Sequence, residues 1–369
     1  MKITHIIIGL NGGGAELMLQ RLVANDPSSL HSVISLTTCG IVGRKLIDKN
    51  ISVFSMGMNK VNFLIVFFRL VLLLRQQKPQ VVQTWMYHSD LFAGTAARLA
   101  GIRKVYWNVR NTEIPQGLFS VTSIIIRIAS FISYIVPKKI ICCGEAAKKS
   151  HINLGYCKRK MFVIPNGYLI DNSNISNSSK NFDHKIKFSN INSIVIGAVG
   201  RFDYLKGYDV LVNAAAHLIQ NSDKNIIFLC IGKDVDWNNS ILVSYINNFN
   251  LKNNFLLAGE IEELEHYYSL MDIFCLSSRA EGFPNVVAEA MLSSLPCVVT
   301  DVGDAAIIVG KHGIVVPKNA HIDIACALKH FVEMDPKIRN LIGNEGRSRI
   351  IENYNINDIV VKYNNLYQD

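Results

Sequence analysis

Residues 193–232, SIVIGAVGRFDYLKGYDVLVNAAAHLIQNSDKNIIFLCIG, contain a short β-branched run, a helix-length pattern and a second apolar run. A strand, a helix and another strand in this order are typical of a βαβ unit with parallel strands. The same alternation occurs upstream, where the apolar run of residues 3–10 precedes AELMLQRLV, and downstream in DIFCLSS, PNVVAEAMLSS and PCVVTDV. We therefore expect an α/β protein with doubly wound parallel sheets.

The length of the chain predicts two domains, because one hydrophobic core stops growing at about 250 to 300 residues and this chain has 369. We place the first domain at residues 1–170 and the second at residues 191–350, since each contains its own series of strand and helix patterns. Residues 171–190 are rich in Asn, Ser and Lys and lack the apolar residues of a core. This segment predicts an exposed linker.

The net charge of +9 is divided unevenly along the chain. Residues 1–170 contain 21 Lys and Arg against 6 Asp and Glu, a net charge of +15, whereas the remaining residues contain 17 against 23, a net charge of −6. A strongly basic half predicts an anionic partner: a nucleic acid, an acidic membrane leaflet or a phosphorylated substrate. A nucleic acid is disfavoured, because no nucleic-acid-binding module and no basic stripe interleaved with aromatic residues occurs.

The 8 cysteines lie mostly in apolar runs such as FLCIG and LPCVV, without CxxC spacing. This placement predicts reduced, buried thiols in a cytosolic protein rather than a disulfide framework or a metal site. Asp234 and Asp236 have the spacing of a metal-binding Asp-x-Asp, but their Asn-rich loop supplies no further ligand. We therefore expect no metal ion.

Two segments, Phe63–Leu74 and Leu118–Pro137, are apolar enough to raise the question of membrane binding. A membrane-spanning helix needs about 20 apolar residues with few charges, and neither segment meets this requirement. The second segment has a narrow polar stripe at helical spacing, formed by Ser120, Ser123, Arg127 and Ser130. Two interpretations stay open: a helix packed on the sheet, or a helix that lies on a membrane. Basic clusters at residues 138–139, 148–149 and 158–160 favour anionic lipid.

The segment SSRAEGFPNVVAEAMLSSLPCVVTD, residues 277–301, predicts an anion-binding site. Glu281 lies in a loop after a strand pattern, and the helix after it begins near a proline, as helices often do. The first turn of that helix presents unpaired backbone N–H groups and the positive end of the helix dipole, which suit a phosphate. The residues of this turn are Gly282, Phe283, Pro284, Asn285 and Val286.

Glu289 lies further along the same predicted helix. A carboxylate can accept two hydrogen bonds from a vicinal diol such as that of ribose. Glu281 and Glu289 beside a phosphate site therefore suit the recognition of a sugar nucleotide. An ordinary strand–loop–helix with incidental acids is the alternative.

Cations and glycines follow other predicted strands. Arg201 and Lys206 lie between a strand and a helix, where two cations could neutralise a diphosphate without a metal. Gly14 ends a run of three glycines that opens a helix, as either a ligand-binding turn or merely a tight one. His88 and Arg110 also follow strands, at the edge where open α/β sheets bind ligands.

Several motifs together resemble the retaining glycosyltransferases of the GT-B fold, in particular family 4, which builds bacterial surface polysaccharides such as O-antigen and capsule. The resemblance extends over the whole chain, and the ordered occurrence of the motifs makes it specific. The motifs are GGGAE, HSDLFAGTAARLAG, KKSHINLGY, VIPNGYLID, GRFDYLKGYDVL, EGFPNVVAEAM and RSRIIENYNINDIVVKYNNLY.

The resemblance implies two Rossmann-like domains that face each other across a cleft. Residues 1–170 would bind the acceptor, residues 191–350 would bind the nucleotide-sugar, and residues 351–369 would form a helix that crosses back to the first domain.

It also implies roles for the site residues. Glu281 would face the donor sugar and Glu289 the ribose, while the backbone of residues 282–286 would contact sugar and phosphates. Arg201 and Lys206 match the basic pair that stabilises the leaving diphosphate. Many members of the family have a His where this chain has Arg110, so Arg110 or His88 would take part of that role.

The resemblance implies a metal-independent retaining transferase without a cofactor. It would move a hexose or N-acetylhexosamine from a UDP-linked donor to a polyprenyl-diphosphate-linked glycan at the inner face of the cytoplasmic membrane. The net charge of +15 of residues 1–170 would hold that domain against the anionic leaflet. The alternatives are a catalytically silent GT-B scaffold that binds a membrane or a partner, and a nucleotide-sugar 2-epimerase or a phosphorylase on the same fold.

Overall fold

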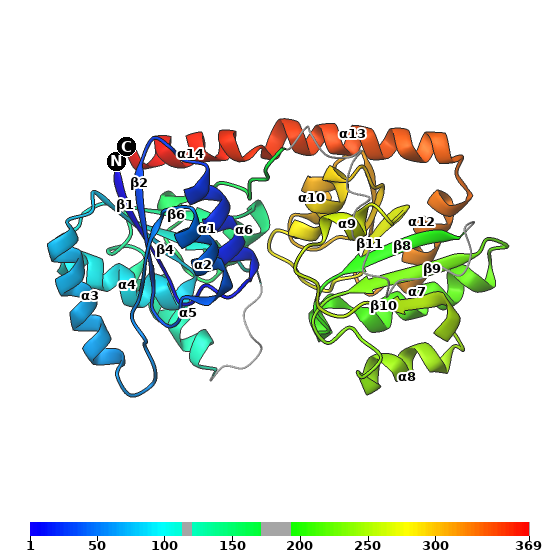
Figure 1. Cartoon of the computed structure of the whole chain (residues 1–369), viewed down its shortest axis with the longest axis horizontal. Coiled ribbons are helices and arrows are strands. Elements are labelled where there is room, and N and C mark those ends of the chain that lie inside the picture. Colours follow the sequence, from blue (N-terminus) through cyan, green and yellow to red (C-terminus); the bar gives the residue numbers. More distant parts are fainter. Residues whose placement is uncertain (113–119, 171–192, 369) are drawn as a thin grey trace. The chain divides into compact units, whose positions relative to one another are not determined.

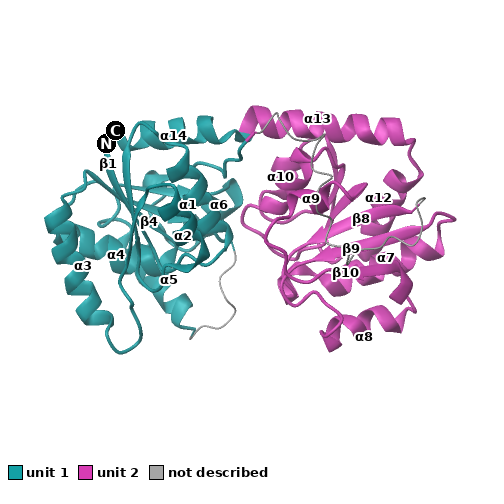
Figure 2. Cartoon of the chain, in the orientation of Figure 1, with its two compact units in different colours: residues 1–169, 354–369 teal, residues 170–353 magenta. Residues whose placement is uncertain are grey.

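The computed structural model describes residues 1–112, 120–170 and 193–368. The chain divides into two compact units (Figure 2): unit 1 contains residues 1–169 and 354–369, and unit 2 contains residues 170–353. The predicted linker, residues 171–190, lies outside the described residues.

Unit 1 is built on a sheet that has seven strands within its described part, in the order β3-β2-β1-β4-β5-β6-β7. Neighbouring strands are parallel throughout. The strands are β1 (Lys2–Ile7), β2 (Leu30–Ser35), β3 (Ser52–Ser55), β4 (Val81–Trp85), β5 (Val105–Val109), β6 (Lys139–Cys142) and β7 (Met161–Val163). The helices are α1 (Gly14–Ala24), α2 (Gly40–Asp48), α3 (Phe63–Gln77), α4 (Tyr87–Leu99), α5 (Val121–Ile132), α6 (Glu145–Asn153) and α14 (Ile356–Gln368), with a 3₁₀ turn at Lys158–Lys160.

Unit 2 is built on a second parallel sheet, which has six strands among the described residues, in the order β10-β9-β8-β11-β12-β13. The strands are β8 (Ile194–Val199), β9 (Ile226–Ile231), β10 (Phe255–Leu257), β11 (Ile273–Leu276), β12 (Cys297–Thr300) and β13 (Gly313–Val316). The helices are α7 (Tyr208–Gln220), α8 (Ser240–Asn248), α9 (Glu265–Tyr268), α10 (Asn285–Leu292), α11 (Ala305–Val309), α12 (His321–Glu333) and α13 (Pro336–Tyr354), with 3₁₀ turns at Tyr204–Lys206 and Lys252–Asn254.

The strand orders confirm the predicted doubly wound α/β fold in both units. In unit 1 the first strand, β1, lies between β2 and β4, and in unit 2 the corresponding strand β8 lies between β9 and β11. The connections from the first strand and from its later neighbour leave in opposite directions, so a crevice opens at the carboxyl ends of these two strands. This switch point is the expected ligand site of each sheet.

Helices cover both faces of each sheet, which explains the apolar strands (Figure 1). Every residue of β4, β5 and β9 is buried, as expected for parallel strands that are covered on both sides. Helix α14 belongs to the core of unit 1, because Ile359, Tyr363 and Tyr367 are buried with β1 and α1. The Tyr367 hydroxyl also donates a hydrogen bond to Gln83 Oε1, at 3.0 Å.

Helix α5 packs against α4 and also exposes apolar side chains, so both interpretations of its sequence stay open. Ser123 is 5% exposed, whereas Ile124 and Ile128 are each 46% exposed and Phe131 is 77% exposed. The helix therefore packs on unit 1 with part of its polar stripe inward and leaves an apolar stripe outside. Among the described residues, no helix combines the length and the hydropathy that crossing a bilayer requires.

Candidate functional site

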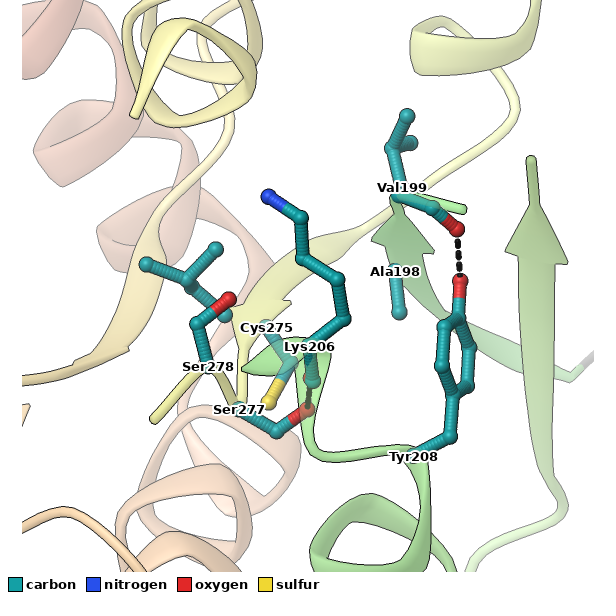
Figure 3. A pocket seen from close by; sticks show the side chains of 9 residues that line it. Ala198, Val199, Lys206, Tyr208, Cys275, Ser277 and Ser278 are labelled. Carbon is teal, nitrogen blue, oxygen red and sulfur yellow. Dashed lines mark hydrogen bonds between the residues drawn. The ribbon is translucent and has the colours of Figure 1, made fainter. Parts of the chain in front are cut away.

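A pocket lies at the switch point of unit 2, between the carboxyl ends of β8 and β11 (Figure 3). The loop after β8 contributes one wall, and the loop after β11 contributes the other. The pocket is lined by Ala198, Val199, Gly200, Lys206, Tyr208, Cys275, Leu276, Ser277 and Ser278.

An ion pair joins the two loops at this pocket. Lys206 Nζ donates to Glu281 Oε1 at 2.7 Å, and the side chains are only 23% and 11% exposed. The Ser278 hydroxyl donates to the same carboxylate oxygen, also at 2.7 Å. Two residues that lie 75 positions apart in the chain are thus brought together, as the predicted site requires.

The backbone of the two loops is interlocked next to this ion pair. The Ser277 hydroxyl donates to the carbonyl oxygen of Lys206, at 3.0 Å. Gly207 has a φ of +65°, and a Cβ atom there would lie 2.3 Å from the carbonyl oxygen of Ser277. Glycine is therefore required at this turn, both for its backbone conformation and for the close approach of the loops.

Arg279 fixes the loop after β11, and the sequence analysis did not single it out. Its guanidinium donates to both carboxylate oxygens of Asp209, at 2.8 and 2.6 Å, and to the carbonyl oxygen of Tyr204, at 2.8 Å. It also lies 4.3 Å from the ring centroid of Tyr204 and bonds Asn319. The hydrogen bonds from Arg279 lower the pKa of the Asp209 carboxyl.

The start of α10 is held from the other side by the turn after β12. The backbone N–H of Asp304 donates to the carbonyl oxygen of Gly282, at 3.1 Å. Gly303 has a φ of +56°, and a Cβ atom there would lie 2.5 Å from the carbonyl oxygens of Glu281 and Gly282. Helix α10 begins at Asn285 with Pro284 as its N-cap, so Gly282 and Phe283 precede the helix instead of forming its first turn as predicted.

The remaining predicted residues of unit 2 lie around this core of the site. Glu289 Oε2 accepts a hydrogen bond from the Tyr268 hydroxyl at 3.3 Å, which orients the second carboxylate of α10. Phe283 is buried, and Asn285 and Val286 open the helix. Arg201 is 65% exposed and pairs with Asp203 at 3.4 Å, so the structure places it outside the Lys206–Glu281 pair.

Two of the predicted residues of unit 1, Gly14 and His88, follow the strands at the switch point of the other sheet. Gly14 begins α1 after β1, and His88 is the second residue of α4 after β4. Burial lowers the pKa of His88, so its imidazole is neutral near pH 7 and can accept a proton. Met86, just before α4, has a φ of +71°, an unfavourable conformation for a residue with a side chain.

Arg110 follows β5 directly, as expected, and its side chain is buried among residues of unit 1. It is 8% exposed and donates to Asn108 Oδ1 and to the Tyr363 hydroxyl, both at 3.1 Å, and to Asn166 Oδ1. Its guanidinium also lies 4.8 Å from the ring centroid of Trp85. These contacts connect α14 to the sheet of unit 1, as a structural residue would. A contact between Arg110 and a donor sugar stays a prediction.

A second residue that sequence reasoning missed is Asp90, in the first turn of α4. Its carboxyl is buried and accepts a hydrogen bond from the Thr84 hydroxyl at 2.5 Å. Desolvation raises the pKa of Asp90 well above its usual range. This carboxyl joins β4 to the helix that carries His88.

Among the described residues, no cluster of three or more His, Cys, Asp or Glu side chains could hold a metal ion. Of the cations predicted for the phosphate site, Lys206 lines the pocket and Arg201 is exposed beside Asp203. Negative charge in this crevice would be met by an ammonium group, an exposed guanidinium and the N–H groups of α10.

Comparison with known proteins identifies the family. The model for "Glycosyltransferase Family 4" matches residues 13–171, and the model for "Glycosyl transferases group 1" matches residues 193–334. One curated relative is the UDP-Gal:alpha-D-GlcNAc-diphosphoundecaprenol alpha-1,3-galactosyltransferase of Escherichia coli, 26% identical over 80% of this chain and 77% of that protein.

A second curated relative and a solved structure are also similar to the chain. The capsular polysaccharide biosynthesis glycosyltransferase CapM of Staphylococcus aureus is 24% identical over 76% of this chain and 74% of CapM. The solved structure of Anabaena Alr3699/HepE in complex with UDP superimposes with a TM-score of 0.82 over 100% of both chains, at 19% identity. The chain therefore belongs to the family 4 glycosyltransferases, which have the GT-B fold.

Proposed function

We propose that the chain transfers a hexose or N-acetylhexosamine from a UDP-linked donor to a polyprenyl-diphosphate-linked glycan, with retention of anomeric configuration and without a metal ion. The observation that carries this proposal is the Lys206–Glu281 pair at the switch point of unit 2. The printed name of the Escherichia coli relative supports the choice of donor and acceptor class, and the HepE complex supports UDP.

The donor site follows from the charges around the pocket. The departing nucleotide diphosphate gains negative charge in the transition state, and groups already oriented toward that charge stabilise it without reorganisation. The ammonium group of Lys206, which is paired with Glu281, and the N–H groups at the start of α10 would contact the phosphates, and Arg201 adds an exposed cation. In this proposal these groups replace the divalent cation that other transferases use.

The two glutamates recognise hydroxyl groups of the donor. Glu281 is oriented by Lys206 and Ser278, which suits an acceptor of hydrogen bonds from the transferred sugar. Glu289 is oriented by Tyr268 and would accept from the ribose diol. Retention requires attack from the face of the departing phosphate, which itself takes part in deprotonating the acceptor hydroxyl.

Unit 1 binds the acceptor in this proposal. His88 lies at the switch point of its sheet, and its imidazole is neutral near pH 7 because burial lowers its pKa. A neutral imidazole can accept a hydrogen bond from an acceptor or donor hydroxyl. The polyprenyl chain of the acceptor is embedded in the membrane, so unit 1 would lie peripherally on the anionic inner leaflet.

Product analysis tests the proposal. The purified chain is incubated with a panel of UDP-sugars and a polyprenyl-diphosphate-linked GlcNAc, with and without EDTA. We expect mass spectrometry to show the addition of one sugar in either condition, and NMR to show that the product keeps the anomeric configuration of the donor.

Each alternative gives a different result in the same assay. An epimerised free nucleotide-sugar would identify an epimerase. No UDP binding at millimolar nucleotide would identify a silent scaffold. Loss of transfer in EDTA with recovery on addition of Mg²⁺ would refute metal independence.

A further inference from the structure

Helices α3, α4 and α5 form one layer on unit 1, and the outer side of this layer is apolar. Both α3 and α5 pack against α4 (Figure 1), and Phe67 of α3 meets Phe92 of α4 edge to face, with ring centroids 5.3 Å apart. Six large apolar side chains point away from the core at helical spacing: Leu64, Phe68 and Leu72 on α3, and Ile124, Ile128 and Phe131 on α5. We call these six residues the α3–α5 surface.

Helix α5 is apolar on its exposed side as well as on its buried side, where Ile126 and Ala129 lie. Its stripe of Ile124, Ile128 and Phe131 faces out, whereas Ser123 is buried and bonded to the N-cap residue Ser120, whose Oγ lies 2.7 Å away. An amphipathic helix on a soluble protein normally turns its hydroxyl groups outward. An apolar stripe that remains outside in this way marks an interaction surface.

Helix α3 repeats this arrangement on the other side of α4. Leu64, Phe68 and Leu72 recur every fourth residue and are 59%, 64% and 63% exposed. The opposite side of the helix fills the core, with Val66 and Leu70 fully buried. The helix is therefore apolar on its buried side and on much of its exposed side, which is typical of contact with a bilayer or another apolar body.

The charges of this layer distinguish a bilayer from another protein surface as the partner of the α3–α5 surface. Residues 49–144 contain 12 Lys and Arg but only 2 Asp and Glu. One acid, Asp90, is buried, and the other, Glu113, lies outside the described residues. Arg69 on α3 and Arg127 on α5 are exposed beside the apolar stripes. The described part of this layer thus offers cations but no accessible carboxylate.

This charge pattern disfavours a second copy of the chain as the occupant. Two such surfaces placed face to face would bring cations together without any carboxylate to pair them, and like charges across an interface oppose association. An anionic leaflet supplies both missing partners, with phosphate groups for the arginines and acyl chains for the apolar stripes.

We propose that the α3–α5 surface is the membrane-binding face of unit 1, where α3 and α5 lie along an anionic leaflet. The apolar side chains enter the boundary between headgroups and acyl chains, and Arg69 and Arg127 meet headgroup phosphates. The inference rests on the proposed function, because it gives unit 1 access to a polyprenyl-linked acceptor at the bilayer surface.

Vesicle co-sedimentation of the full chain tests this surface. The probes are vesicles of phosphatidylcholine alone and of phosphatidylcholine with phosphatidylglycerol. We expect the wild-type chain to bind the second kind and to lose affinity as salt rises. The Phe68→Asp/Phe131→Asp variant should bind at least about tenfold more weakly, because two charges replace inserted rings. Ile241→Asp is the matched control, because Ile241 is 54% exposed on α8 of unit 2.

Several outcomes would overturn the assignment. These are a wild-type chain that does not bind anionic vesicles, a double variant that binds as the wild type does, and an Ile241→Asp control that weakens binding equally. A dimer in analytical ultracentrifugation that the double variant dissolves would assign the surface to a second copy instead.

A parallel assay separates this inference from the proposed function. Transfer to a short-chain, water-soluble acceptor does not need a membrane, so the double variant should retain the wild-type rate. Retained transfer also shows that the variant is folded. Vesicle binding without any transfer by the wild-type chain would refute the function and leave the surface standing. Sugar transfer by the wild-type chain without any vesicle binding would refute the membrane-binding surface and leave the proposed function standing.

Discussion

Replacing Arg279 with methionine tests whether the loop that carries Glu281 must be held by a distant residue. The substitution removes the guanidinium and its bonds to Asp209, Tyr204 and Asn319 but keeps an apolar stem beside the Tyr204 ring. A hydrogen bond to a charged group contributes roughly 1.5 to 3 kcal/mol when it is buried. Because Asp209 is 39% exposed, solvent replaces part of this loss.

We therefore expect Arg279→Met to lower the free energy of unfolding by about 2 kcal/mol, measured by urea denaturation. The larger effect should be on catalysis, since a displacement of about 1 Å in a positioning loop can cost about 10²-fold in rate. Arg279→Lys keeps the charge but not the two parallel bonds to the carboxylate, so it should recover only part of kcat.

The pH dependence of the free energy of unfolding gives a second test, because the hydrogen bonds from Arg279 lower the pKa of Asp209. A lowered folded-state pKa adds stability above the unfolded value of about 3.9, and this stability is lost as the pH falls through the folded-state value. In Arg279→Met that loss should be smaller over the same acidic range. A variant with unchanged stability and unchanged kcat/KM would refute the reasoning. A variant with lower stability but wild-type kcat/KM would show that the bonds made by Arg279 do not position Glu281.

Two further predictions concern the backbone at the site and the proposed acceptor side. Gly303→Ala places a Cβ atom 2.5 Å from the carbonyl oxygen of Glu281, so we expect kcat to fall by at least about tenfold. Gly57→Ala is the control, because Gly57 has a φ of +63° and no atom within 4 Å of an added Cβ, so that variant carries only the backbone cost. An equal loss of kcat in both variants would contradict the prediction. For His88, whose pKa is lowered by burial, kcat/KM should hold as the pH falls through about 6.5 and decline only below it. This acid limb should vanish in His88→Asn, and an unchanged limb would assign the titration to another group.

The fold and the two residues of the main ion pair could be predicted from local signals, although their pairing could not. Alternating strand and helix patterns predicted the two parallel sheets. Position after a strand predicted Lys206 and Glu281, since the carboxyl ends of adjacent parallel strands lie at one edge. No knowledge of distant contacts was needed for these inferences.

The hydrogen bonds between Arg279 and Asp209 could not be predicted in this way. Asp209 lies 70 positions upstream of Arg279, and no spacing connects the two. Arg110 shows the same limit, because the Tyr363 hydroxyl that binds it comes from a helix 253 positions away. An arginine after a strand has the same sequence signal whether it binds a ligand or a helix.

The orientation of α5 escaped prediction for a different reason. Its polar stripe consists largely of serines, whose small hydroxyl groups can be satisfied inside the protein. The buried Ser123 hydroxyl lies 2.7 Å from the Ser120 hydroxyl. Burying such a group costs little when it is bonded, so hydrophobic periodicity alone does not decide which side of this helix faces water.

The rate of sugar transfer by Lys206 and Glu281 variants tests the central claim most directly. Lys206→Ala and Glu281→Gln should each reduce kcat by at least about 10²-fold, because in the proposed function each removes a group that binds the donor. Lys224→Ala and Asp223→Asn are matched controls, since both residues are exposed in the turn between α7 and β9, at the opposite edge of the sheet. We expect the controls to keep the wild-type kcat and all four variants to stay folded by circular dichroism. Wild-type kcat in both site variants would contradict the assignment of the donor site.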